Sequence, residues 1–401
     1  MSDYVRRVTE PDKPLLPRLG TLDIELTERC DNDCIHCCIN LPLGEKDAHA
    51  REMTTEQVDG VLEQAAELGC LQVRFTGGEP LVRPDFEELY LFARRLGLKV
   101  LLFTNARQLG VGEDGSGGRG EQLVDLLARV PPLVPVEVTV YGMHRDSYEA
   151  VSRAPGSFEQ FRRGVDRLLN RGVPFIVKSV LLPPNRAEME EFEAWAATLP
   201  GMSDPPGYAL FLDLRNRRDD PAKNSLIASM RLSPQEALAV LTRDEVAYRR
   251  EKTQFAARFM APPGAELFRC GAGQAVSIDA YGRAQPCMSL RAPEFTIDLV
   301  GSAQGGASPG TLASALDRFA QLRDIRTTDP AYLRRCAMCF LQSLCEQCPA
   351  KSWSEHGTLD TPVVYHCEMA HAQARFLGWL SDDEKAWNVT DWPNRTQSQG
   401  E

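Results

Sequence analysis

The first two hundred residues alternate short apolar runs with amphipathic stretches, and no other feature constrains the fold as much. We expect strands at 21–26, 71–76, 99–104, 136–141, 175–182 and 208–214. Helical patterns lie between them; the first has Thr54 or Thr55 as its N-cap and Gly69 as its C-cap. Because parallel strands need crossover connections, six βα units predict a parallel sheet covered by helices. An open doubly wound sheet and a partial barrel both satisfy the pattern, and both bind ligands at the C-terminal strand ends.

Charge and composition exclude several classes of function. The chain has 56 acidic and 45 basic residues and a net charge of -11. It therefore has no bulk electrostatic reason to hold a nucleic acid or an anionic membrane. No apolar run approaches the ~18 to 20 residues of a membrane span, and the N-terminus lacks an apolar signal core. We expect a cytoplasmic protein with no nucleic-acid partner and no membrane partner.

The chain contains 12 cysteines. In a reducing compartment, clusters of cysteines predict metal ligands or catalytic thiols and not structural disulfides. The early group is Cys30, Cys34, Cys37, Cys38 and Cys70, and the late group is Cys270, Cys287, Cys336, Cys339, Cys345, Cys348 and Cys367. Two separate cofactor regions are the natural interpretation.

Three cysteines of the early group, Cys30, Cys34 and Cys37, have the spacing C-x3-C-x2-C directly after the first expected strand. A structural zinc site takes four ligands, usually in paired C-x2-C knuckles, and this spacing fits it poorly. A thioredoxin-like C-x-x-C pair would leave Cys30 unexplained. A [4Fe-4S] cluster held by three cysteines, with one open iron, explains all three.

Together with "GGEP" at 77–80, directly after the second expected strand, this loop resembles that of the radical S-adenosylmethionine (radical SAM) enzymes. The resemblance implies a partial (β/α)6 TIM-type barrel. It also implies that the open iron chelates SAM, and that reductive cleavage yields a 5'-deoxyadenosyl radical that abstracts a substrate hydrogen. The residues implied to contact SAM are His36, which stands at the family's aromatic position near the adenine, and Gly77, Gly78, Glu79 and Pro80.

Other strand ends carry the resemblance more weakly. Asn105, Thr139 and Lys178 stand where family members contact the ribose or the carboxylate of SAM, although each could simply be a polar residue that caps a strand. Lys178 lies inside an apolar strand and should have an anionic partner.

Candidate catalytic residues come from the sixth expected strand and from the cysteine loop. Asp213 and Tyr208 are candidate general bases. Cys38 is either a hydrogen-atom donor or a packing residue beneath the loop, and Cys70 is a small core residue.

The late cysteines, with a turn at Gly282, are similar to the SPASM domain, which carries two auxiliary [4Fe-4S] clusters. The spacing departs from the usual pattern in having two residues, not three, between Cys345 and Cys348. By analogy Cys336, Cys339, Cys345 and Cys367 would bind the outer cluster, and Cys270, Cys287 and Cys348 the inner one, which then has an open or non-cysteine site. A four-cysteine zinc site is the alternative, and it leaves Cys270, Cys287 and Cys367 unexplained.

The expected domains follow from these assignments. They are an N-terminal extension at 1–20, the radical SAM barrel at 21–221, a helical connector at 222–265, the auxiliary-cluster domain at 266–372, and a C-terminal helix and tail at 373–401. The Gly-rich run at 110–120 is interpreted as a surface loop and not as a phosphate cradle.

Enzymes with a SPASM domain are dominated by maturases of ribosomally made peptides, and "VYGMHRDSYEAVSRAPGSF", "VKSVLLPPN" and "CEQCPA" resemble that group. We expect an enzyme that crosslinks or otherwise oxidises a precursor peptide, with flavodoxin or ferredoxin as reductant. A separate recognition protein, or direct binding of the leader, would present the peptide. The alternative is a dehydrogenase or epimerase of a sugar, aminocyclitol or other small natural-product intermediate. A third interpretation is an iron-sulfur scaffold or electron carrier, but it does not explain the complete "GGEP", because an electron carrier needs no SAM pocket.

Overall fold

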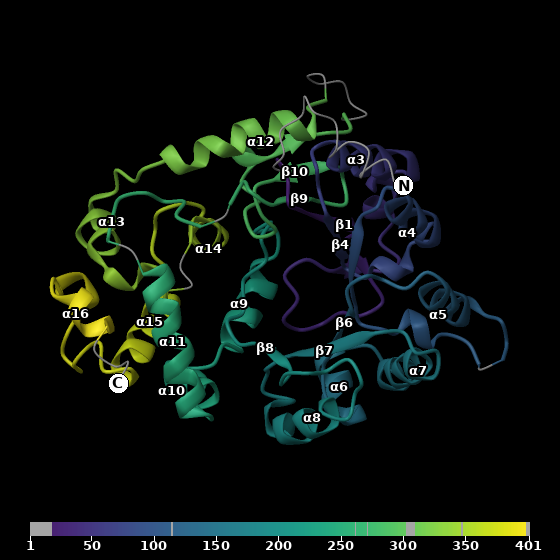
Figure 1. The fold of residues 1–401 in the computed structure, drawn as a ribbon, viewed down its shortest axis with the longest axis horizontal. Coiled ribbons are helices and arrows are strands. Elements are labelled where there is room, and N and C mark those ends of the chain that lie inside the picture. The colour runs from purple at the N-terminus through teal and green to yellow at the C-terminus, as the bar shows by residue number, and fades with distance from the viewer. Residues whose placement is uncertain are drawn as a thin grey trace. The chain divides into compact units, whose positions relative to one another are not determined.

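The computed structural model describes residues 18–113, 115–260, 262–270, 272–301, 309–345 and 348–397 (Figure 1). The chain divides into two compact units. The first unit contains the described parts of residues 1–230 and 271–320, and the second those of 231–270 and 321–401. The expected auxiliary-cluster region at 266–372 is therefore shared between the two units.

The first unit is built on a sheet whose strand order, in the described part of the chain, is β11-β10-β9-β1-β4-β5-β6-β7-β8. The parallel strands are β1 (Thr21–Thr27), β4 (Gln72–Gly77), β5 (Lys99–Thr104), β6 (Val136–Val140), β7 (Phe175–Val180) and β8 (Gly207–Ala209). These six strands confirm the expected series, although β8 ends well before residue 214. Their order follows the chain without reversal, as in a partial barrel and not as in a doubly wound sheet.

Three short strands extend the sheet beyond β1. β9 (Val276–Ile278) runs parallel to β1, β10 (Arg283–Gln285) pairs antiparallel with β9, and β11 (Ile297–Asp298) pairs antiparallel with β10. The β9–β10 turn has Gly282 at φ 78°, in the left-handed region that favours glycine. A separate small sheet pairs β2 (Arg29–Cys30) with β3 (Leu41–Pro42).

Helices of the first unit follow the strands in the order expected of βα units. They are α2 (Lys46–Arg51), α3 (Thr55–Glu67), α4 (Phe86–Arg95), α5 (Arg119–Arg129), α6 (Arg145–Ser152), α7 (Ser157–Asn170), α8 (Met189–Ala196), α9 (Pro221–Ser229) and α12 (Leu312–Ala320). Thr54 is the N-cap of α3: its hydroxyl accepts from the Gln57 N–H, and the Gln57 side chain accepts from the Thr54 N–H. The described residues 111–113 and 115–118 form a loop before α5, as predicted.

The two faces of the sheet differ in character. On the helix face Leu22 and Ile24 are fully buried, and the Phe75 ring lies 6.3 Å from Phe86 of α4. The inner face carries charged side chains, and Asp23 lies opposite Arg74 with their charged groups 2.9 Å apart. Because side chains alternate along each strand, the register decides which residues share a face.

The second unit is largely helical. Its helices are α10 (Pro234–Leu241), α11 (Glu245–Phe259), α13 (Pro330–Arg334), α14 (Pro349–His356), α15 (Val364–Phe376) and α16 (Trp392–Gln397). Its core packs Tyr248 of α11 with Phe340 and Trp379, so the part of the expected helical connector from residue 231 on belongs to this unit, whereas α9 belongs to the first. Among the described residues, no helix is long and apolar enough to cross a membrane.

Candidate active site

Four of the early cysteines, Cys30, Cys34, Cys37 and Cys38, lie in the segment that leaves β1 and forms the small β2–β3 sheet. Cys30 is the last residue of β2 and is buried with Cys34, while Cys37 and Cys38 are half-buried. All twelve cysteines of the chain are free thiols. The structure therefore gives no support to a structural disulfide.

The donor set of this loop fits an iron-sulfur cluster. Burial raises the pKa of the Cys30 thiol well above its usual value, with the Asp31 carboxylate adding to the shift, and burial likewise raises the pKa of the Cys34 thiol. Three thiolates packed here need a compensating positive charge, which iron would supply. The buried amide Nδ2 of Asn32 and the ring Nδ1 of His36 have no hydrogen-bond partner among the described residues.

The "GGEP" segment packs directly against the start of the cysteine loop. The backbone N–H of Gly78 donates to the Thr27 carbonyl at 2.7 Å, and that of Glu79 donates to the Arg29 carbonyl at 3.0 Å. A Cβ atom on Gly77 would lie 2.1 Å from the Thr27 oxygen, and one on Gly78 would lie 2.3 Å from the Arg29 oxygen. Both glycines are therefore required for this close backbone approach, whatever they contact in SAM.

Glu79 joins the ends of two neighbouring strands. Its buried carboxylate accepts from the Leu81 N–H at 3.1 Å, the Thr104 hydroxyl at 2.9 Å and the Asn105 N–H at 2.8 Å. Burial, with the nearby charge of Asp31, raises the pKa of Glu79 to about 8. Pro80 is buried and begins the turn η1 (Pro80–Val82) that follows.

Asn105 connects the end of β5 to the cysteine loop. Its Nδ2 lies 2.8 Å from Asp31 Oδ1 and 3.8 Å from Cys30 Sγ, and Gln108 Nε2 lies 2.8 Å from Asp31 Oδ2. Arg107 Nη1 donates to Asn32 Oδ1 at 2.7 Å. Sequence reasoning found Asn105 but missed Asp31, Arg107 and Gln108, although the polar run "NARQ" after an apolar strand was a usable signal.

His36 lies beside the aromatic end of β6. Its ring centroid is 5.8 Å from that of Tyr141, and the Tyr141 side chain opposes the rise that burial causes in the pKa of the Cys34 thiol. Burial, with a smaller contribution from Lys223, lowers the pKa of His36 to about 4, so this ring is uncharged at neutral pH. Lys223 of α9 donates to the Cys34 carbonyl at 2.9 Å, which anchors α9 on the cysteine loop.

On the inner face, Lys178 has the anionic partner that its position predicted. Its ammonium pairs with the Glu137 carboxylate, and it also lies 5.5 Å from the Phe103 ring centroid. Arg74 lies 4.9 Å from the same ring. Thr139 stands opposite Lys178 in the strand register. Contact of Thr139 and Lys178 with SAM stays a prediction.

Two of the three candidate catalytic residues, Cys38 and Asp213, lie within electrostatic range of each other. Burial, with smaller contributions from Cys37 and Asp213, raises the pKa of the Cys38 thiol to about 12, and Arg291 opposes this rise. Asp213 lies beyond the end of β8, in a segment without regular secondary structure.

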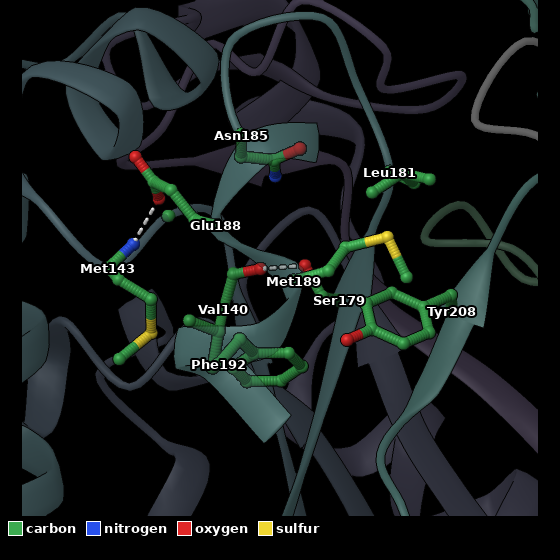
Figure 2. A pocket seen from close by; sticks show the side chains of 10 residues that line it. Val140, Met143, Ser179, Leu181, Asn185, Glu188, Met189, Phe192 and Tyr208 are labelled. Carbon is green, nitrogen blue, oxygen red and sulfur yellow. Dashed lines mark hydrogen bonds between the residues drawn. The ribbon is translucent and has the colours of Figure 1, made fainter. Parts of the chain in front are cut away.

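Tyr208 lies on the helix face. It is paired in register with Ser179, whose neighbour in β6 is Val140, and all three line a small pocket (Figure 2). The Tyr208 hydroxyl donates to Glu193 of α8 at 3.1 Å, and its ring centroid lies 5.8 Å from that of Phe192. Because odd and even residues of a strand point to opposite faces, Tyr208 points away from the inner face, and its role as a general base stays a prediction.

Sequence reasoning also missed a buried ionic network near the cysteine loop. Glu25 and Glu28 are each 1% exposed; Glu25 pairs with Arg291, and Glu28 pairs with Arg217. The Tyr281 hydroxyl donates to Glu28 at 2.6 Å. Glu25 and Glu28, in and just after an apolar strand pattern, were the signal, but their arginine partners lie 189 and 266 positions away along the chain.

A cavity of about 530 Å³ in the second unit contains most of the late cysteines. The cysteines that line it are Cys270, Cys336, Cys339, Cys345, Cys348 and Cys367. Burial raises the pKa of Cys336 to about 11 and that of Cys339 to about 12. Cys287 follows β10 and belongs to the first unit. In the described part of the chain, no group of three or more His, Cys, Asp or Glu side chains converges as a single metal ion requires.

The chain matches one family model and several PqqA peptide cyclases. Residues 24–196 match the model of the radical SAM superfamily. A PqqA peptide cyclase of Xanthomonas euvesicatoria is 28% identical over 389 residues, or 90% of each chain. A PqqA peptide cyclase of Gluconobacter oxydans is 47% identical over 98 residues, which cover 24% of this chain and 25% of the relative.

Solved structures resemble the fold. Streptococcus suis SuiB bound to its precursor peptide SuiA has a TM-score of 0.56 and 15% identity, covering 89% of this chain and 77% of SuiB. The enzyme anSMEcpe with bound AdoMet has a TM-score of 0.57 and 14% identity, covering 94% of this chain and 98% of that chain. At these identities the likeness concerns the fold alone.

Proposed function

We propose that this chain, as a radical SAM enzyme that uses SAM and a [4Fe-4S] cluster, oxidatively modifies a ribosomally made precursor peptide. The observation that supports this most is the likeness to PqqA peptide cyclases, which extends over 90% of the chain and is not confined to the superfamily region. A crosslink between side chains of the peptide is the form of modification that we propose first.

The residues of the chain would act as follows. Cys30, Cys34 and Cys37 would hold the cluster, and "GGEP" with His36 would contact SAM. When bound, the cluster and SAM supply a 5'-deoxyadenosyl radical that abstracts a hydrogen atom from the substrate. Asp213, beside Cys38, would receive the proton that leaves the substrate.

We further propose that the late cysteines hold two auxiliary clusters, as in the SPASM domain. The outer cluster would use Cys336, Cys339, Cys345 and Cys367, and the inner one Cys270, Cys287 and Cys348. Crosslinking is a net oxidation, and these clusters would accept the second electron. Iron analysis of the reconstituted chain should give about twelve irons per chain for three [4Fe-4S] clusters; about four would remove the auxiliary clusters from the proposal.

The partners in this proposal are a precursor peptide, a reductant such as flavodoxin or ferredoxin, and either a separate recognition protein or a leader that binds the enzyme directly. The reaction would take place in the cytoplasm. To test it, reduced enzyme is incubated with SAM and the synthetic precursor peptide encoded beside its gene. Formation of 5'-deoxyadenosine together with a peptide that has lost two hydrogens supports the proposal, and an unchanged peptide contradicts it.

A second candidate is a dehydrogenase or epimerase of a sugar, aminocyclitol or similar small molecule. The raised pKa of Cys38 favours it, because the thiol then keeps the hydrogen atom that an epimerase must return to its substrate. Substitution of Cys38 by Ala separates the two candidates. If the product changes from epimerised to oxidised, the small-molecule function holds; if the product is unchanged, Cys38 is a packing residue.

A further inference from the structure

Arg335 lies in the wall of the cysteine-lined cavity and points its guanidinium at the thiols. Its Nη2 donates to Cys367 Sγ at 3.2 Å. Cys336, the next residue in the chain, and Cys339 both lie within electrostatic range of the same guanidinium. Arg335 thus faces three of the four cysteines proposed for the outer auxiliary cluster.

The guanidinium of Arg335 is paired with a cysteine sulfur and not with a carboxylate. Within the described ranges Arg335 forms no ion pair with Asp or Glu, and its buried Nε has no hydrogen-bond partner. A buried N–H without a partner costs free energy unless a bound group accepts its hydrogen bond. The orientation therefore indicates that the guanidinium interacts with a group that binds in the cavity.

Trp387 fixes the position of the guanidinium. The guanidinium carbon of Arg335 lies 4.8 Å from the centroid of the Trp387 ring, a distance typical of a cation–π contact. The His371 ring packs against the same indole at 5.4 Å. His371 is itself held, because its Nδ1 lies 2.8 Å from the Cys367 carbonyl and its Nε2 accepts from the Ala386 N–H at 3.2 Å.

We propose that Arg335 is the counter-cation of the outer auxiliary cluster and raises the reduction potential of that cluster; this inference rests on the proposed assignment of Cys336, Cys339, Cys345 and Cys367 as its ligands. Reduction adds negative charge to a cluster. A positive charge and an N–H donor at a ligand sulfur stabilise the reduced form more than the oxidised form, and hydrogen bonds to sulfur and net charge are known determinants of cluster potentials. Arg335 is thus a positioning residue and not a ligand.

The test is a redox titration of the full reconstituted chain followed by electron paramagnetic resonance, with iron measured in each sample. Arg335→Gln should shift the midpoint potential of one auxiliary cluster to a more negative value, and Arg335→Lys should give a smaller shift in the same direction. The SAM-binding cluster should keep its potential in both variants. Arg334→Gln is the matched control, because Arg334 is the adjacent residue and is exposed; it should change no potential.

Trp387→Leu provides a second variant that retains the charge of Arg335 but removes the ring that orients it. We expect a negative shift smaller than that of Arg335→Gln. Full iron content with unchanged potentials in Arg335→Gln overturns the inference. Loss of iron from all three variants at Arg335 and Trp387 also overturns it, because these residues would then serve to retain the cluster. About four irons in the unsubstituted chain would instead refute the auxiliary clusters themselves.

Discussion

The side-chain amide of Asn105 donates from Nδ2 to Oδ1 of Asp31 at 2.8 Å and thereby ties the end of β5 to the loop that carries the early cysteines. Glu79 completes the connection, since its carboxylate accepts from the Asn105 backbone N–H at 2.8 Å. The ends of β1, β4 and β5 are thus joined by polar side chains that are themselves buried or half-buried. These contacts fix the position of the cysteine loop relative to the ends of β4 and β5.

Substitution of Asn105 should loosen the cysteine loop. Asn105→Ala removes the donor to Asp31 and should destabilise the cluster-free protein by about 1–3 kcal/mol. Asn105→Asp keeps the shape but places a second carboxylate beside that of Asp31, and should be the more damaging change at neutral pH. Thermal unfolding and iron retention measure both effects. Equal stability of Asn105→Asp and the unsubstituted chain would show that Asp31 does not depend on this amide.

The contact between "GGEP" and the cysteine loop leaves no room for a side chain at Gly78. A Cβ atom there would lie 2.3 Å from the Arg29 carbonyl oxygen, so the backbone must shift. We expect Gly78→Ala to cost about 1–3 kcal/mol and to abolish SAM cleavage. Gly60→Ala in α3 is the control, because nothing lies within 4 Å of its added methyl group, and alanine should stabilise that helix. Undiminished 5'-deoxyadenosine formation by Gly78→Ala would contradict the fit.

The elements that the sequence predicted are those with local signals. The six parallel strands, the cap at Thr54 and the loop that carries Cys30, Cys34 and Cys37 all depend on short stretches of chain. The pairing of β9 with β1 could not be predicted, because three residues near position 277 carry no pattern that names a partner about 250 positions earlier. The same separation hid the contact of Arg291 with Glu25.

The face of the sheet toward which a residue of a short strand points could not be predicted from the sequence either. Tyr208 was predicted for a strand of seven residues, but β8 has three, and its register with Ser179 turns the ring toward α8. The resemblance to the SPASM domain implied that Cys270, Cys336 and Cys348 are ligands, and the structure places all three on one cavity. Side-chain spacing is encoded locally, whereas register depends on the whole sheet.

Asp59 on α3 makes stability depend on pH at a position remote from the cysteines. Burial and repulsion by Glu88 raise the pKa of its carboxyl from 3.8 to about 6. Since the folded state binds this proton more tightly than the unfolded state, the contribution of Asp59 is full below about pH 4 and is lost as the pH rises through 6. Asp59→Asn should therefore raise the melting temperature at pH 7.5 but not at pH 4. The gain should stay below about 1 kcal/mol, because the carboxyl is partly exposed.

Tyr208 points to the helix face, whereas Asp213 lies within electrostatic range of Cys38, so we expect different effects on turnover when each is substituted. Tyr208→Phe removes a hydroxyl that donates to Glu193 on the helix face, so it should cost about 0.5–1.5 kcal/mol of stability and leave turnover unchanged. Asp213→Asn removes a carboxylate beside Cys38 and should reduce product formation about 100-fold or more, the range lost with a general base. Product and 5'-deoxyadenosine are quantified together in both variants. If Asp213→Asn still forms 5'-deoxyadenosine but little product, the carboxylate acts after hydrogen abstraction; if product forms at the normal rate, Asp213 is not the base.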